Sequence, residues 1–115
     1  MFDYEWTERA EKDFKILEKE AGLIKKRRLQ KRKGKSSRQE GLLKQVVKTL
    51  QLLQQNPRHP GLNTHAYSSL EHPYSNEEKV FEAYAQNHTP GVYRVFWCYG
   101  PQKKQITLIA ITSHP

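Results

Sequence analysis

The hydrophobic residues of this 115-residue chain repeat with one period in its first half and with another in its last third. Between residues 10 and 24 they recur at steps of three and four, which places them on one stripe of an α-helix. A second set with helical spacing lies between residues 42 and 53. From residue 79 onward, β-branched and aromatic residues form short runs separated by turn residues, which is typical of strands. Two segments with helical spacing followed by several strand-like runs predict an α+β fold.

The first boundaries are set by alternation and by a capping residue. Phe2, Tyr4 and Trp6 alternate with acidic residues, which predicts a short N-terminal strand with one buried face. Thr7 is a suitable N-cap for the helix that follows. The apolar stripe of that helix consists of Ala10, Phe14, Leu17, Ala21 and Ile24.

The second helix is delimited by a capping box and by a proline. Ser37 and Glu40 have capping-box spacing, and Pro57 stops the helix after about residue 55. Because a short polar connection joins the two helices, we expect an αα-hairpin.

The remainder of the chain predicts a small sheet. Residues 56–78 show no clean period, although residues 64–70 could form a short strand. Residues 79–85, 92–99 and 106–112 have strand character, and the turn signals between them make them antiparallel neighbours. We therefore predict one domain over residues 1–115, with an N-terminal strand, a helical hairpin and a C-terminal three-stranded antiparallel sheet.

Positive charge is concentrated in one stretch. Lys and Arg number 20 against 12 Asp and Glu, a net charge of +8, and residues 25–35 alone carry eight positive charges. A block of this kind indicates a polyanion partner such as nucleic acid, or simply a solvated helix end. A helix lying on a membrane fits least well, because the apolar stripe precedes the charges. The basic residues are Lys25, Lys26, Arg27, Arg28, Lys31, Arg32, Lys33 and Lys35.

The remaining composition predicts a cytoplasmic protein. The sequence has no apolar run of about 18 residues for a membrane span, and its first residues lack the pattern of a signal peptide. Cys98 is the one cysteine, which excludes an intrachain disulfide and fits a reducing compartment. It lies in an apolar run, so we expect a buried thiol rather than a reactive one.

Arg94 and His114 are the first candidates for chemistry. Arg94 is the one charge within residues 92–99; it could form a structural pair with Glu82 on the neighbouring strand or bind an anion such as phosphate. His114 follows the last strand, where it could act as an acid or base near neutral pH, or belong to a disordered tail.

Strand alternation bears on whether these two residues meet. It places Ile106, Leu108, Ala110, Thr112 and His114 on one face of the last strand. Arg94 shares a face of the preceding strand with Phe96 and Cys98, and the register between the strands decides whether the two faces coincide. The other histidines fit no zinc spacing, so we expect no metal.

Four segments, in this order along the chain, resemble the RelE/ParE toxin superfamily. They are NPRHPGL at 56–62, FEAY at 81–84, GVYRVFW at 91–97 and IAITSHP at 109–115. The resemblance implies a helical hairpin packed on a small antiparallel sheet. For the RelE branch it also implies a toxin of a type II toxin–antitoxin system, a cytoplasmic endoribonuclease that cleaves mRNA on the ribosome without a cofactor. A cognate antitoxin protein would block it.

The resemblance also implies roles for particular residues. Arg94 matches the arginine of the family's "YR" strand, and His114 matches the catalytic basic residue after the last strand. The lysine or glutamate that serves as base in family members has no match, and Glu82 is the substitute we consider first. Tyr84, Tyr93 and Tyr99 are candidates for stacking on RNA bases, although we expect at least two of them to pack in the core instead. The basic residues of 25–35 are candidates for binding ribosomal RNA.

Two other functions stay open. The ParE branch inhibits DNA gyrase by protein binding, without RNA cleavage. The missing base residue also allows a catalytically inactive protein of the same fold that only binds its partner.

Overall fold

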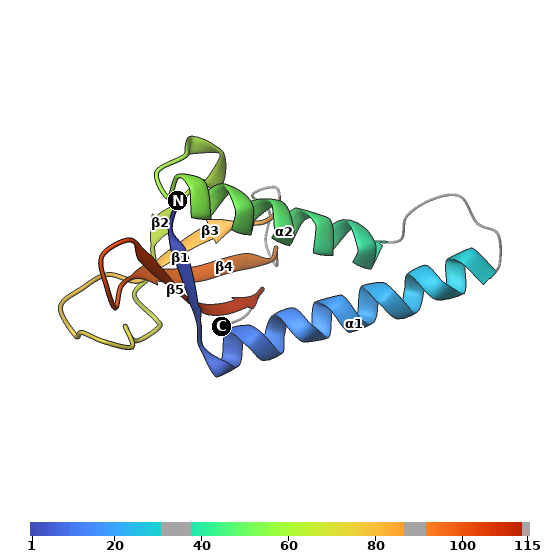
Figure 1. Cartoon of the computed structure of the whole chain (residues 1–115), viewed down its shortest axis with the longest axis horizontal. Helices are drawn as coiled ribbons and strands as arrows, with labels where there is room; N and C mark the ends of the chain where they lie inside the picture. Colours follow the sequence, from blue (N-terminus) through green and yellow to red (C-terminus); the bar gives the residue numbers. More distant parts are fainter. Residues whose placement is uncertain (31–37, 87–91, 114–115) are drawn as a thin grey trace.

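A computed structural model describes residues 1–30, 38–86 and 92–113, and in this part of the chain two α-helices cover one face of a five-stranded sheet (Figure 1). The predicted α+β class is confirmed, whereas Ser37 lies outside the described residues. The elements are β1 (Asp3–Trp6), α1 (Glu8–Gln30), α2 (Arg38–Gln55), the 3-10 helix η1 (Pro60–Leu62), β2 (His65–Ala66), β3 (Phe81–Tyr84), β4 (Arg94–Tyr99) and β5 (Gln105–Thr112).

The sheet is larger than predicted, and it is mixed. Its strand order is β1-β5-β4-β3-β2, so the three antiparallel strands expected from the sequence form only its centre. β1 pairs in parallel with β5, with Asp3 opposite Gln105 and Trp6 opposite Leu108. The two helices supply the long connection that a parallel neighbour requires. The three predicted antiparallel strands are therefore present, but the prediction missed that β1 and β2 extend them to a five-stranded, mixed sheet.

The two faces of the sheet have separate cores. Both predicted helical stripes pack against one face, where Leu17, Val46 and Leu53 meet Trp97. The opposite face, here called the outer face, has a smaller cluster that residues Tyr67 and Leu70 help to cover; its buried members are Val80, Phe96, Cys98, Ile109 and Ala110. Burial raises the pKa of the Cys98 thiol to about 11, in keeping with the expected buried thiol.

The start of α1 completes the edge of β5 beyond the end of β1. The Thr7 hydroxyl accepts a hydrogen bond from the Ala10 amide (3.1 Å), as an N-cap does, and donates one to the Ile109 carbonyl (2.8 Å). Asp13 Oδ2 accepts from the Ile111 amide at 2.9 Å. These side chains bind backbone groups that an edge strand would otherwise leave to water, and they fix α1 to the sheet.

A β-bulge changes which residues of β5 share a face. The register between β4 and β5 shifts between Phe96 and Trp97. As a result, Ile106 and Leu108 belong to the core under the helices, and Ala110 belongs to the outer cluster. The predicted alternation from 106 to 112 is therefore wrong, because a bulge inserts one residue and reverses the facing of those beyond it.

The helical hairpin extends beyond the sheet and makes the molecule elongated, with extents of 52 × 27 × 26 Å (Figure 1). Among the described residues, neither helix combines the length and the apolar character needed to cross a bilayer.

Candidate functional site

Arg94, at the first position of β4, forms the centre of a polar cluster on the outer face. Its Nη1 donates to Glu82 Oε2 on β3 at 2.8 Å, and its Nη2 donates to the Ser113 carbonyl at 2.7 Å. The side chains of Arg94 and Glu82 are 20% and 9% exposed, respectively. The pairing with Glu82 that the sequence left open as an alternative is thus present in the structure.

Aromatic rings and a phenol surround this ion pair. The Arg94 guanidinium carbon lies 5.0 Å from the centroid of the Phe96 ring and 5.7 Å from that of Tyr67, within cation–π range. The Tyr84 hydroxyl donates to Glu82 Oε1 at 3.1 Å. Burial, reinforced by this bond to the carboxylate, raises the pKa of Tyr84. Both carboxylate oxygens of Glu82 are therefore engaged.

One N–H of the guanidinium is buried without a hydrogen bond. Arg94 Nε is buried and has no hydrogen-bond partner among the residues that the structure describes. A buried N–H without a partner is costly, and it is often explained by a ligand or water.

His65 is a further member of the cluster. It pairs with Glu82 in the register of β2 and β3, its ring lies 6.1 Å from the Tyr84 ring, and its Nδ1 is 2.7 Å from the Asn63 carbonyl oxygen. Sequence analysis missed His65 and Tyr67 as site residues. The only available signal was their position in residues 64–70, where the sequence allows a short strand; the observed strand β2 includes His65 and ends just before Tyr67.

The two tyrosines of the predicted RNA-binding set do not join this cluster. Tyr93 is half-buried and packs against the core under the helices, on the face opposite to Arg94. Tyr99 is 40% exposed but lies at the far end of β4, where it contacts Phe81 and Trp97. The structure thus brings together Arg94, Glu82 and Tyr84, but neither Tyr93 nor Tyr99.

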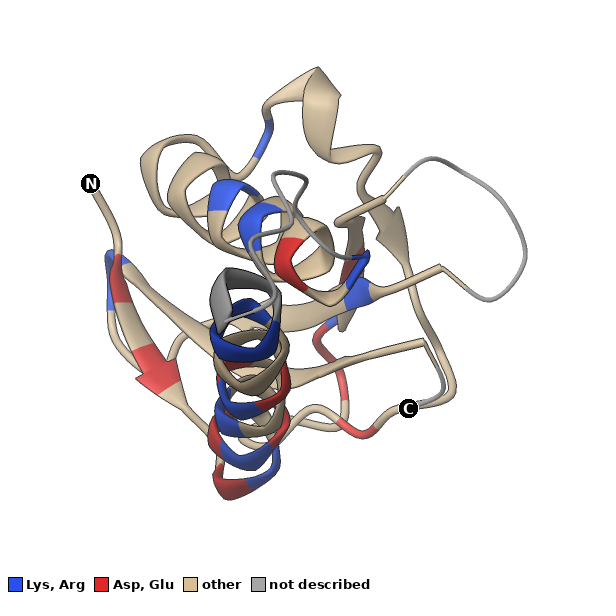
Figure 2. Ribbon diagram, turned by 90° about the vertical axis from the view of Figure 1, so that its right-hand side faces the viewer, with Lys and Arg blue, Asp and Glu red and all other residues tan. Residues whose placement is uncertain are grey.

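The basic stretch is described in part. Lys25, Lys26 and Arg27 are exposed on the later turns of α1, and Arg28 lies in the same helix. Figure 2 shows that the earlier turns of α1 mix both signs of charge, while its far end is positive. The other predicted residues lie outside the described part of the chain; they are Lys31, Arg32, Lys33, Lys35 and His114.

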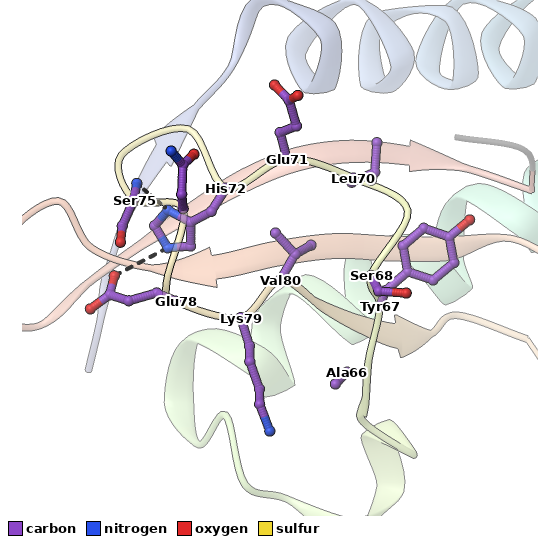
Figure 3. A pocket seen from close by; sticks show the side chains of 11 residues that line it. Ala66, Tyr67, Ser68, Leu70, Glu71, His72, Ser75, Glu78, Lys79 and Val80 are labelled. Carbon is purple, nitrogen blue, oxygen red and sulfur yellow. Dashed lines mark hydrogen bonds and ion pairs between the residues drawn. The ribbon is translucent and has the colours of Figure 1, made fainter.

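A pocket of about 580 Å³ lies beside the cluster, within the segment that runs from β2 to β3 (Figure 3). His72 is on its wall with only 2% of its side chain exposed. The His72 Nδ1 accepts the Tyr74 and Ser75 amides, both at 3.1 Å, and its Nε2 lies 3.3 Å from Glu78 Oε2. That last distance suits an ion pair, but Nε2 makes no hydrogen bond within the described structure.

Within the described ranges, no group of three or more His, Cys, Asp or Glu side chains could hold a metal ion. Comparison with protein-family models, with curated proteins and with solved structures finds no match in any of the three. The resemblance to the RelE/ParE superfamily therefore stays a prediction.

Proposed function

We propose that this protein is the toxin of a type II toxin–antitoxin system, a metal-independent endoribonuclease that cleaves mRNA on the ribosome. The observation that carries the proposal is the Arg94 cluster. A guanidinium with a buried, unused N–H lies among aromatic side chains on the sheet face that the helices leave uncovered. It also contacts Ser113, the residue before His114. Guanidinium, phenol and imidazole groups together suit the cleavage of a phosphodiester.

The proposed reaction needs only groups of the RNA and of this chain. The ribose 2′-oxygen attacks the adjacent phosphorus, its proton passes to a base, and the bond to the 5′-oxygen breaks. Arg94 offsets the charge that builds on the phosphoryl oxygens, and His114 protonates the departing 5′-oxygen. Glu82 serves as the base, which requires that RNA displace its contacts with Arg94 and Tyr84.

That requirement is the reason for a second candidate function. Because Glu82 and Arg94 already form a largely buried ion pair, the two residues also suit a protein that binds its partner without cleavage. Such a protein would act by contact alone, as a gyrase inhibitor of the ParE kind or as an inactive relative.

The partners follow from the same proposal. The positive end of α1 would attract ribosomal RNA through a term that depends on salt and not on sequence. A cognate antitoxin would cover the outer face and so keep RNA away from Arg94.

The test is mRNA cleavage on translating ribosomes, mapped by primer extension. We expect the wild-type protein to cut mRNA in phase with the ribosome, and Arg94→Ala and His114→Ala to reduce the rate by about a hundredfold or more. Arg58→Ala is the matched control, because Arg58 is an exposed arginine on the loop after α2.

The outcomes separate the candidates. Intact mRNA together with inhibited gyrase supercoiling would assign the protein to the ParE kind. Intact mRNA and unaffected gyrase, with tight binding of a neighbouring acidic protein, would support the inactive relative. Circular dichroism of each variant has to match the wild type, since Arg94 also contributes to packing.

A further inference from the structure

The pocket in the segment between β2 and β3 shares a side chain with the Arg94 cluster. Tyr67 lines the pocket, and its ring is also 5.7 Å from the Arg94 guanidinium carbon and 4.8 Å from the Phe96 ring in an edge-on arrangement. A molecule bound at Arg94 therefore has this pocket as its neighbour. The volume of about 580 Å³ lies within the range of roughly 300–1,000 Å³ that is common for ligand sites.

The lining combines an apolar floor with a polar rim. Tyr67, Leu70 and Val80 supply apolar surface, above the outer cluster of the sheet. Hydroxyl, amide and charged groups make up the rim, and Figure 3 shows Ser75 and Glu78 beside His72. An apolar surface with polar groups at its edge suits a flat heteroaromatic ring.

The net negative charge of the rim disfavours phosphate and favours a hydrogen-bond donor. Glu71 and Glu78 outnumber Lys79, the one cation of the lining. The His72 Nδ1 accepts two backbone amides, so this nitrogen has no donor to offer a ligand. The His72 Nε2 lies 3.3 Å from Glu78 Oε2, so the Glu78 carboxylate is at the wall of the pocket.

We propose that this pocket binds a guanine base of the RNA whose phosphate lies at Arg94. Guanine presents two adjacent donors, N1–H and N2–H, on its Watson–Crick edge, and a single carboxylate can accept both. Glu78 supplies this carboxylate, His72 positions it, and Tyr67 forms the wall next to the phosphate. The inference rests on the proposed function for the phosphate site, to which it adds a base preference.

The experiment uses two single-stranded RNA pentamers, AAGAA and AAUAA, with a deoxyribose at the central position to prevent cleavage there. Affinities are measured by fluorescence anisotropy, and the amide resonances of the pocket are followed by NMR. We expect the guanine pentamer to bind about tenfold more tightly and to shift the amides of Ser68, Asn76 and Glu78. The substitution Glu78→Gln should remove the difference, because an amide presents one acceptor and one donor.

Glu77→Gln is the matched control. It changes the same charge one residue away, on a side chain that is exposed and does not line this pocket. Equal affinity for the two pentamers, or a guanine preference that survives Glu78→Gln, would overturn the inference. A preference for guanine without any mRNA cleavage on ribosomes would reject the nuclease function and support the guanine-binding pocket. Cleavage without a base preference would support the nuclease function and reject the guanine-binding pocket.

Discussion

The pairing of Arg94 with Glu82 has an energetic consequence at the scale of single residues. The guanidinium lies against the Phe96 ring, on an apolar surface that offers few other acceptors, and the Ser113 carbonyl accepts one more of its donors. When one member of a largely buried ion pair is removed, the other charge is left poorly solvated. That loss usually exceeds the net value of the pair itself.

Glu82→Gln should therefore lower the free energy of unfolding by about 3 kcal/mol, because it removes the charge opposite Arg94 and keeps the shape of the side chain. Urea unfolding followed by tryptophan fluorescence at pH 7 measures this. Glu77→Gln, on an exposed carboxylate, should change the value by less than about 0.5 kcal/mol. A similar small loss for both variants would show that solvent already screens the Arg94 charge.

The sequence identifies some members of this cluster and misses others for a physical reason. Arg94 was identifiable because it is the one charge in an apolar strand, and Glu82 because the strand order makes it a neighbour. Tyr67 and His65 come from a segment with no hydrophobic period, and β2 there has only two residues. A pairing that short leaves no pattern in a single sequence.

At the scale of elements, the edge strand β1 is fastened to α2 as well as to β5. The Tyr4 hydroxyl donates a hydrogen bond to the Leu50 carbonyl, and the Phe2 amide donates to the Gln54 carbonyl at 3.0 Å. Burial raises the pKa of Tyr4 above its ordinary value of 10.0. The phenol therefore has to stay protonated for β1 to keep its contact with the helix.

Tyr4→Phe should cost about 1 kcal/mol of stability at neutral pH, the usual value of one hydrogen bond. The stability that Tyr4 supplies is fully present below pH 10 and is lost as the pH rises further, because the unfolded chain ionises first. The difference in the free energy of unfolding between the wild type and Tyr4→Phe should therefore become smaller between pH 10 and about pH 11.5. Urea unfolding across this range tests it, and a difference that is constant with pH would contradict it.

The arrangement of elements was predictable only where local signals decide it. The Thr7 cap and the end of α2 at Gln55 follow from nearby residues, and both are confirmed. The parallel pairing of β1 and the bulge in β5 depend on long-range contacts, which alternation along one strand does not contain. A single inserted residue was enough to move Ile106 and Leu108 to the other face.

At the scale of the whole molecule, positive charge and the candidate site lie on different elements. Lys25, Lys26 and Arg27 are on the later turns of α1, in the hairpin that extends beyond the sheet, whereas Arg94 is on β4 (Figures 1 and 2). The first turns of the same helix carry lysines that are balanced by glutamates, as in the pairs Lys12–Glu8 and Lys15–Glu11. The two ends of α1 therefore offer a comparison between lysines in ion pairs and basic residues that have no ion-pair partner among the described residues.

Replacing Lys25, Lys26 and Arg27 by glutamine should weaken RNA binding and flatten its dependence on salt. Each phosphate contact with a single strand contributes about 0.7 to the slope of log affinity against log salt, so the loss of three contacts should reduce the slope by about 2. Titration of a fluorescent RNA at several salt concentrations measures the slope. The corresponding triple change of Lys12, Lys15 and Lys19 removes equal charge from the other part of the helix and should have a smaller effect, since two of these lysines are paired with glutamates.

If α1 only attracts RNA and the sheet acts on it, cleavage by the variant of Lys25, Lys26 and Arg27 should recover at high ribosome concentration. A variant that binds with an unchanged slope would show that the end of α1 does not contact the polyanion.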